Sequence, residues 1–381
     1  MYGKMIENFK KGKIMDYPIL MGELEKRALP NVFTAQNGES VRTKDVWEEA
    51  QRPYWLNILL KEEYGKIPPR VQPAITTQTN VVDFAGKAVW ETVTFTFTYK
   101  GKTHSFPTNL IYPVGAKSVP FFIYLNFRPD VPDRYLPVEE LIDNGFGVFS
   151  VCYNDVTKDD GDFTDGLAGI FQEGERAGND TGKICYWAYA ASNMMDYLRT
   201  RPEADAEAIG VCGHSRLGKT ALLTAAIDER FAFACSNNSG CSGAGISRYA
   251  DEKAEKIADI CKKFPYWFAP NYLQYANNEQ ALPFDQHCLI AMIAPRAVYV
   301  GGAIEDIWAG NDNQFLSCVA ATPVWELYGI DGMITPDKLP ECGDTLTDGN
   351  VGFHLRKGKH FHSRTDWLIY MDAVKKYLQR K

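Results

Sequence analysis

Several patterns that would mark other classes of protein are missing from this sequence. The nine cysteines are scattered and none forms a C-x-x-C pair, so neither a zinc site nor a redox motif is predicted. The net charge of -7 at pH 7 argues against a protein that binds nucleic acid. No stretch of about 18 apolar residues occurs, so we expect no membrane-spanning helix. We therefore predict no metal, no organic cofactor, no nucleic-acid partner and no membrane partner.

Two further absences bear on location. An odd, unpaired set of cysteines is typical of reduced, buried thiols, as in cytoplasmic proteins. Residues 1–20 contain lysines but no apolar core of about 7–15 residues, so they do not form a signal peptide. The sequence thus predicts a cytoplasmic location, although a secreted protein from which a signal peptide had been removed would look similar.

Hydrophobic residues make up 45% of the 381 residues and aromatic residues 13%, enough to bury a large core. Apolar or alternating segments that indicate strands are separated by segments typical of helices. This alternation predicts an α/β fold whose mostly parallel sheet is covered by helices on both faces. We expect residues 1–80 to form an N-terminal extension that packs on a catalytic domain of residues 81–381. The strands are expected at 93–99, 108–112, 120–125, 146–151, 208–212, 232–236, 297–301 and 352–355, and helices at 47–64, 187–198, 220–226 and 366–377.

Residues 213–220 read GHSRLGKT and fit two different chemistries. Ser215 follows an apolar strand and precedes a helix, the setting of the nucleophile elbow of α/β hydrolases, although Leu217 stands where the second glycine is usual. The same eight residues fit the phosphate-binding loop G-x-x-x-x-G-K-[ST]. A third interpretation is that Ser215 is an ordinary helix N-cap.

Two features favour the elbow. A phosphate-binding loop cradles phosphates with backbone N–H groups and favours glycine in its four middle positions, none of which is glycine here. Such a loop also usually follows the first strand of its domain, whereas at least four expected strands precede residue 213. These arguments favour a serine nucleophile without excluding the phosphate-binding loop.

A serine nucleophile needs a histidine base that is oriented by a carboxylate, and in this fold they follow in the order Ser, acid, His. Glu305 and Asp306 lie in a loop after an expected strand. Loops at the carboxyl ends of strands are where α/β sheets place their sites. His360 lies in a loop after the last expected strand and is the candidate base. His354, within that strand, is expected to be structural, and His214 either lines the site or packs under the elbow.

From Trp47 to the C-terminus the chain resembles the glucuronoyl esterases of carbohydrate esterase family 15, in their bacterial branch. The serine motif of that family, Gly-x-Ser-Arg-x-Gly-Lys, matches residues 213–219, which explains the apparent phosphate-binding loop as a coincidence of spacing. Further matches occur in the same order along the chain, at residues 63–65, 187–198, 228–231, 236–240, 282–287, 294–296, 305–308, 358–360 and 366–367.

The resemblance implies an α/β-hydrolase fold and a serine esterase that acts on glucuronoyl esters without a cofactor. It assigns Arg216 to the oxyanion, and Lys219 and Trp308 to the sugar. Many members carry the acid as a glutamate where this sequence has Asn238, so the acid should come from the next strand's loop, as Asp306 first and Glu305 second.

Three alternatives remain open from the sequence. The enzyme could remove acetyl groups from sugars instead of hydrolysing glucuronoyl esters. The chain could bind a nucleotide through residues 213–220. It could also bind carbohydrate without catalysis, because Asn238 shows that one acid position has changed.

Overall fold

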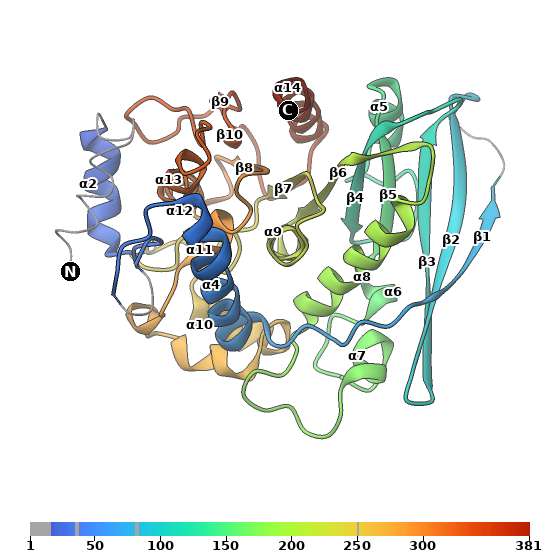
Figure 1. Ribbon diagram of the computed structural model, residues 1–381, viewed down its shortest axis with the longest axis horizontal. Helices are drawn as coiled ribbons and strands as arrows, with labels where there is room; N and C mark the ends of the chain where they lie inside the picture. Colours follow the sequence, from blue (N-terminus) through green and yellow to red (C-terminus); the bar gives the residue numbers. More distant parts are fainter. Residues whose placement is uncertain (1–16, 35–37, 81–83, 250) are drawn as a thin grey trace.

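The computed structural model describes residues 17–34, 38–80, 84–249 and 251–381, and its centre is a ten-stranded sheet (Figure 1). The central strands β5, β4, β6, β7, β8 and β10 run parallel, while β1, β2, β3 and β9 pair antiparallel at the two edges. The order across the sheet is β1 (Ala74–Thr79), β2 (Ala88–Tyr99), β3 (Lys102–Pro113), β5 (Gly147–Cys152), β4 (Val119–Asn126), β6 (Ala204–His214), β7 (Phe233–Asn237), β8 (Ala297–Ala303), β10 (Val351–Arg356) and β9 (Thr345–Leu346).

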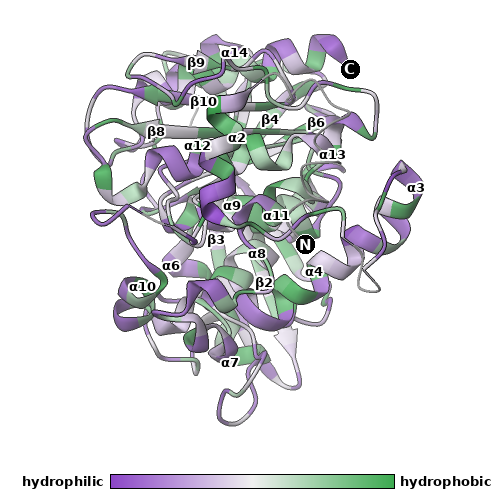
Figure 2. Ribbon diagram, turned by 90° about the vertical axis from the view of Figure 1, so that its left-hand side faces the viewer, coloured by the Kyte–Doolittle hydropathy of each residue, from purple (hydrophilic) through white to green (hydrophobic). Residues whose placement is uncertain are grey.

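Helices cover both faces of the sheet, and each face has its own hydrophobic core. The smaller core lies under α5 (Val138–Asp143) and α14 (Arg364–Arg380), and the larger one lies under the remaining helices (Figure 1). In Figure 2 the outer loops are largely hydrophilic, whereas hydrophobic segments gather in the strands and helices between them. The larger core includes α4 (Arg52–Leu59), α8 (Lys183–Leu198), α9 (Arg216–Ile227), α11 (Gln286–Ala291) and α12 (Asn311–Ala321).

Further helices and helical turns occur among the described residues. They are α2 (Pro18–Arg27), α3 (Lys44–Val46), α6 (Tyr153–Val156), α7 (Gly166–Phe171), α10 (Ile257–Lys263) and α13 (Pro323–Glu326), the π-helical turns η2 (Trp47–Gln51) and η3 (Leu60–Tyr64), and the 3₁₀ turns η4 (Pro265–Trp267), η5 (Pro270–Tyr275), η6 (Glu279–Ala281) and η7 (Ile307–Ala309). Among the described residues no helix is both long and apolar enough to cross a membrane.

The predicted α/β architecture is confirmed, and every strand expected from the sequence lies within or overlaps an observed one. The edge strands β1 and β9 were missed for physical reasons. β1 is polar and largely exposed, so it lacks the apolar alternation that signals a strand, and β9 has only two residues. Both are defined by backbone pairing to a neighbour, which a local pattern does not reveal.

The first described residues pack on the catalytic part of the chain. Trp47 and Trp55 are buried in the larger core. Arg52 donates from its guanidinium to the backbone carbonyls of Met292 and Ala226, at 3.0 and 2.8 Å. β1 pairs with β2 along its full length, so this segment also extends the sheet. The division of the chain at residue 80 stays a prediction.

Glu63, at the end of η3, is fully buried against Gln286, whose side-chain amide donates to both carboxylate oxygens at 3.2 and 3.3 Å. Burial raises the pKa of Glu63 from 4.5 to about 8. The folded chain therefore keeps a proton that the unfolded chain releases near pH 4.5. The stability that this proton confers is complete below pH 4.5 and is lost as the pH rises through 8.

We predict that Glu63→Gln flattens this pH dependence. A glutamine needs no proton to stay neutral, and its amide can donate to the Gln286 side-chain carbonyl, which is buried and has no partner among the described residues. Urea unfolding of both proteins from pH 5 to 9 should show the variant gaining stability relative to wild type, by at most ~1.4 kcal/mol per pH unit. A difference that stays constant over this range would contradict the assignment.

Candidate active site

Ser215 lies at the sharp turn between β6 and α9. Its backbone has φ 59° and ψ -127°, a conformation that a residue with a side chain rarely adopts and that costs about 1–3 kcal/mol. The surrounding structure holds it there: the Ser215 N–H donates to the carbonyl of Asn237, at the end of β7, at 2.8 Å. The local strand, turn and helix predicted from the sequence are therefore present.

Two glycines permit this turn, and the second explains the departure from the usual hydrolase motif. A Cβ on Gly213 would lie 2.1 Å from the carbonyl oxygen of Leu217. A Cβ on Gly218 would lie 3.0 and 3.1 Å from side-chain atoms of Ser239 and Ser236. The close approach of the helix to β7 thus occurs at residue 218, and Leu217 is free to be a buried hydrophobic residue.

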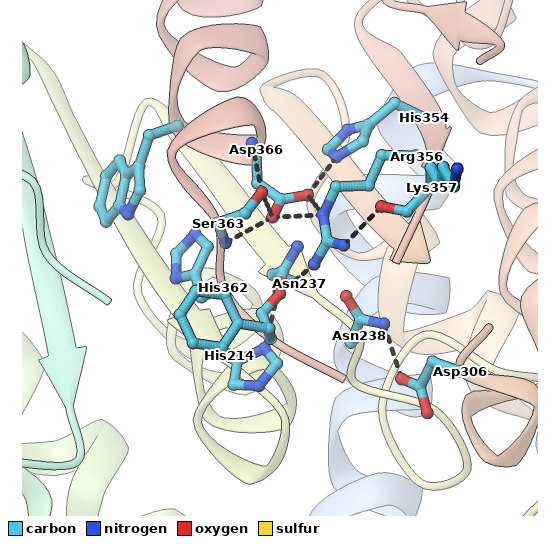
Figure 3. A network of polar contacts seen from close by, with 12 residues as sticks. His214, Asn237, Asn238, Asp306, His354, Arg356, Lys357, His362, Ser363 and Asp366 are labelled. Atoms are coloured by element: carbon cyan, nitrogen blue, oxygen red, sulfur yellow. Dashed lines mark hydrogen bonds and ion pairs between the residues drawn. The ribbon is translucent and has the colours of Figure 1, made fainter. Parts of the chain in front are cut away.

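The structure brings His360 and Asp306 together from two different loops. His360 Nδ1 lies 2.7 Å from Asp306 Oδ2, and the same oxygen accepts a hydrogen bond of 2.6 Å from the side-chain amide of Asn238. The contact between Asn238 and Asp306 is drawn in Figure 3. Asp306 is 6% exposed, whereas 44% of the His360 side chain is exposed. The carboxylate is therefore shielded and the imidazole accessible, as a general base requires.

Parallel topology explains this convergence. Ser215, Asn238, Asp306 and His360 follow β6, β7, β8 and β10 respectively, and these four strands are neighbours that run in one direction. The carboxyl ends of these strands therefore lie side by side at one end of the sheet, where α/β proteins place their sites. No hydrogen bond joins Ser215 to His360 in the described part of the chain, and in unliganded enzymes such bonds are often long.

Glu305, the second candidate acid, lies elsewhere. Its side chain is exposed, and its backbone N–H donates to the carbonyl of Gly358 at 3.0 Å. That bond ties the Asp306 loop to the His360 loop. Since the neighbouring Asp306 carboxylate holds the imidazole, the geometry favours Asp306 over Glu305 as the orienting acid.

The other histidines at this end are buried. The His214 ring lies 4.5 Å from the His360 ring, centre to centre, and His214 Nδ1 lies 2.7 Å from the Asn237 side-chain oxygen. Burial lowers the pKa of His214 well below its usual value, so the ring that lies next to His360, the candidate base, is uncharged. His354 contacts Asp366 at 2.8 Å, in the structural role expected of it, and Figure 3 shows this network around Asp366.

Arg216 is held beside Ser215 by an ion pair and by aromatic rings. Its guanidinium contacts Asp159 and lies 4.5 Å from the centre of the Trp267 ring. Asp159 also accepts a hydrogen bond of 2.6 Å from the Trp267 indole N–H. The Nε–H of Arg216 is buried and has no partner among the described residues. As the first residue of α9, Arg216 also has a backbone N–H without an acceptor inside the helix.

Glu255, a residue that the sequence analysis did not single out, lies next to both Lys219 and Trp308. The Lys219 ammonium donates to the backbone carbonyls of Ser239, at 2.6 Å, and Cys241. Its third donor faces the Glu255 carboxylate at 3.6 Å, beyond hydrogen-bonding distance. The backbone N–H of Glu255 donates to the carbonyl of Trp308 at 2.8 Å, and Trp308 is 45% exposed. Glu255 is thus connected to Trp308 through its backbone and to Lys219 through its carboxylate, and no spacing in the sequence could have revealed it.

Within the described ranges, no three His, Cys, Asp or Glu side chains are arranged to hold a metal ion. A cavity of about 740 Å³ lies at the other end of the parallel strands, near their amino ends, around Arg296 and the end of α14. The site is thus defined by the convergence of side chains at the strand ends.

Comparison with known proteins decides the family. Residues 95–329 match the family described as "Glucuronyl esterase, fungi". The chain is 30% identical to carbohydrate esterase MZ0003 of an unknown prokaryotic organism, over 92% of this chain and 89% of the relative. This chain belongs to the glucuronoyl esterase family. It is a carboxylic ester hydrolase of the bacterial branch of that family, so the activity predicted from the resemblance is confirmed.

Further relatives agree. A 4-O-methyl-glucuronoyl methylesterase of Schizophyllum commune is 27% identical, with 96% of this chain and 85% of the relative covered. The structure of a glucuronoyl esterase from Solibacter usitatus superposes with a TM-score of 0.84 at 32% identity, covering 92% of this chain and 98% of that one. Because the family is one of esterases, residues 213–220 are interpreted as an elbow and not as a nucleotide-binding loop.

The predicted cytoplasmic location is wrong. The homologues are secreted glucuronoyl esterases that act on extracellular plant polysaccharides. The cysteine argument fails because eight of the nine thiols are buried and all are unpaired. Burial shields such thiols from oxidants in any compartment, so their pattern carries no information on location.

Proposed function

We propose that Ser215, His360 and Asp306 form the catalytic triad with which this glucuronoyl esterase hydrolyses 4-O-methyl-glucuronoyl esters. The observation that carries the proposal is the chain of contacts from Asn238 through Asp306 to His360, at the same sheet edge as Ser215. The names of the relatives, 4-O-methyl-glucuronoyl methylesterases, support the substrate class.

In the first half of the reaction, His360 Nε2 takes the proton of the Ser215 hydroxyl as its Oγ attacks the ester carbonyl carbon. Asp306 accepts the Nδ1–H of His360, which sets the tautomer and stabilises the imidazolium. The developing oxyanion accepts hydrogen bonds from the backbone N–H of Arg216, which has no acceptor within its own helix, and from its Nε–H, which has no partner among the described residues. One such donor contributes about 10²–10³ in rate.

In the second half, the carbon–oxygen bond to the alcohol breaks and His360 gives its proton to that oxygen. Ser215 then carries the uronoyl group as an ester. Water, deprotonated by His360, attacks this acyl-enzyme, and the proton returns to Ser215 as the uronate leaves. Asn238 donates to the Asp306 oxygen that faces His360, which keeps the carboxylate in place without adding a second negative charge.

We propose that the uronate ring stacks on Trp308 while its hydroxyl groups bind Lys219 and Glu255. An ammonium has three donors, and the third donor of Lys219 forms no hydrogen bond within the described structure, since its nearest acceptor is at 3.6 Å. A sugar hydroxyl can accept from Lys219 and donate to Glu255 at the same time. The exposed indole offers an apolar face to the ring carbons.

The test compares esters with and without a sugar. We expect the protein to hydrolyse benzyl glucuronate in preference to the galacturonate epimer and to acetylated xylo-oligosaccharides. Trp308→Ala should raise KM for benzyl glucuronate about three- to tenfold, because apolar contact is lost, and leave p-nitrophenyl acetate hydrolysis unchanged. Trp308→Phe is the matched control, which keeps an aromatic face. Preference for the acetylated sugars, or equal losses on both substrates, would contradict the uronate assignment.

A further inference from the structure

A cavity of about 480 Å³ lies beside the loop that carries Asp306, near the carboxyl ends of β8 and β10. We propose that this cavity, the Tyr249 pocket, binds neutral sugar residues of the glycan to which the esterified uronate is attached. Its walls include Arg27, Tyr249, Ile304, Ile307, Asp312 and Asn313. Its volume falls within the range of about 300–1,000 Å³ that is usual for ligand sites. The proposal rests on the proposed function for the identity of the glycan.

Exposed hydrophobic side chains gather at this pocket. Twelve large hydrophobic side chains are exposed among the described residues, and Tyr249, Ile304 and Ile307 are three of them, at 61%, 42% and 52%. Trp308, the neighbour of Ile307 in the chain, is a fourth. Scattered exposed hydrophobic residues need no explanation, but a cluster of them marks a binding surface.

The backbone of Tyr249 is strained. Its φ is 54°, which is unusual for a bulky residue and costs about 1–3 kcal/mol. The guanidinium of Arg27 lies 5.6 Å from the centre of its ring. Arg27 is itself fixed by Asn313 at 2.9 Å and by the Glu23 carboxylate at 3.1 Å. Strain that keeps an aromatic ring exposed and oriented is accounted for if the ring contacts a ligand.

The polar groups of the pocket suit hydroxyl groups better than charges. The Asp312 side chain is exposed, and its carboxylate has no hydrogen bond or ion pair with any described residue. Asp251 and Glu252 add acidic charge at the rim, whereas the charge of Arg27 is offset by Glu23. An anionic sugar would be repelled here. A neutral sugar can donate its hydroxyl protons to these carboxylates and place its apolar face on Tyr249.

The same short segment forms a wall of the pocket and part of the proposed catalytic site. Ile304 and Ile307 line the pocket, Asp306 contacts His360, and Trp308 is the proposed platform for the uronate. The segment is anchored to the end of β10 and to the loop that follows, since the N–H groups of Ile304 and Glu305 donate to the carbonyls of Arg356 and Gly358. The Tyr249 pocket and the proposed uronate platform therefore share one short segment, residues 304–308.

The experiment measures binding and turnover separately. Titration calorimetry with xylotetraose, a neutral sugar without an ester, is carried out on wild type, Tyr249→Ala and Tyr249→Phe. We expect Tyr249→Ala to weaken binding roughly tenfold and Tyr249→Phe to change it little, because the ring is kept. Thermal unfolding verifies that both variants are folded. In parallel, kcat/KM is measured for methyl glucuronate alone and for the same ester carried on a xylo-oligosaccharide, where only the second should fall in Tyr249→Ala.

The outcomes distinguish this proposal from the proposed function. If glucuronate esters are hydrolysed but folded Tyr249→Ala binds xylotetraose and turns over the long ester as wild type does, the pocket assignment is overturned and the function stands. If xylotetraose binding depends on Tyr249 while no glucuronate ester is hydrolysed, the function fails and the pocket stands. Absence of xylotetraose binding to wild type also overturns the pocket.

Discussion

Ser215→Ala should abolish ester hydrolysis while leaving the fold intact. The variant lacks the hydroxyl proposed as the nucleophile, and alanine removes one oxygen without altering the backbone bond to Asn237. Members of a triad act as a unit, so losses up to about 10⁶ in kcat are expected if chemistry limits turnover. Hydrolysis of benzyl glucuronate under single-turnover conditions measures the effect.

His360→Ala supplies the matched comparison, because it removes the base and leaves the serine. Each single variant should lose nearly as much as the double variant, since neither group works without the other. A wild-type rate in folded Ser215→Ala would rule out the acyl-enzyme mechanism. Losses that multiply in the double variant would show that the two residues act independently.

Asp306→Asn should lower kcat by about 10³–10⁴, as the loss of an orienting acid does in serine hydrolases. The buried carboxylate accepts from His360 at 2.7 Å and from Asn238 at 2.6 Å. An asparagine presents either an uncharged oxygen or an N–H to the imidazole, so it cannot stabilise the imidazolium and can select the wrong tautomer. Thermal unfolding serves to separate this effect from a loss of folding.

Glu305→Gln is the control for Asp306→Asn, because the two carboxylates are neighbours in one loop and only Asp306 contacts the histidine. We expect the glutamine variant to retain most of the activity. The reverse order of effects would make Glu305 the acid. Near-normal activity in both variants would mean that another group orients His360.

The sequence could predict the order of the candidate catalytic residues along the chain but not their arrangement in space. The elbow was predictable because a strand, a turn and a helix are local, and the glycines that permit the turn lie within three residues of Ser215. The departure at Leu217 looked like a weakness of the motif. Only the packing of Gly218 against Ser236 and Ser239 shows why the second glycine is shifted by one position.

Contacts between segments that are distant in the sequence could not be predicted. Glu255 lies 36 positions after Lys219, and its backbone pairing with Trp308 appears only in three dimensions. The same holds for the Tyr249 pocket, in which Arg27 from α2 meets Tyr249. Neither arrangement has a periodicity or a spacing that a sequence pattern could detect.

By itself the sequence determined the α/β class, the position of the elbow and the family, because these depend on local periodicity and on a series of short motifs in a constant order. The tertiary structure decided which carboxylate contacts His360. Asp306 and Glu305 are adjacent and equally acidic, and parallel strands that end at one edge place one of them against the imidazole and leave the other exposed. That choice depends on the direction in which each side chain leaves a folded loop, which no local pattern encodes.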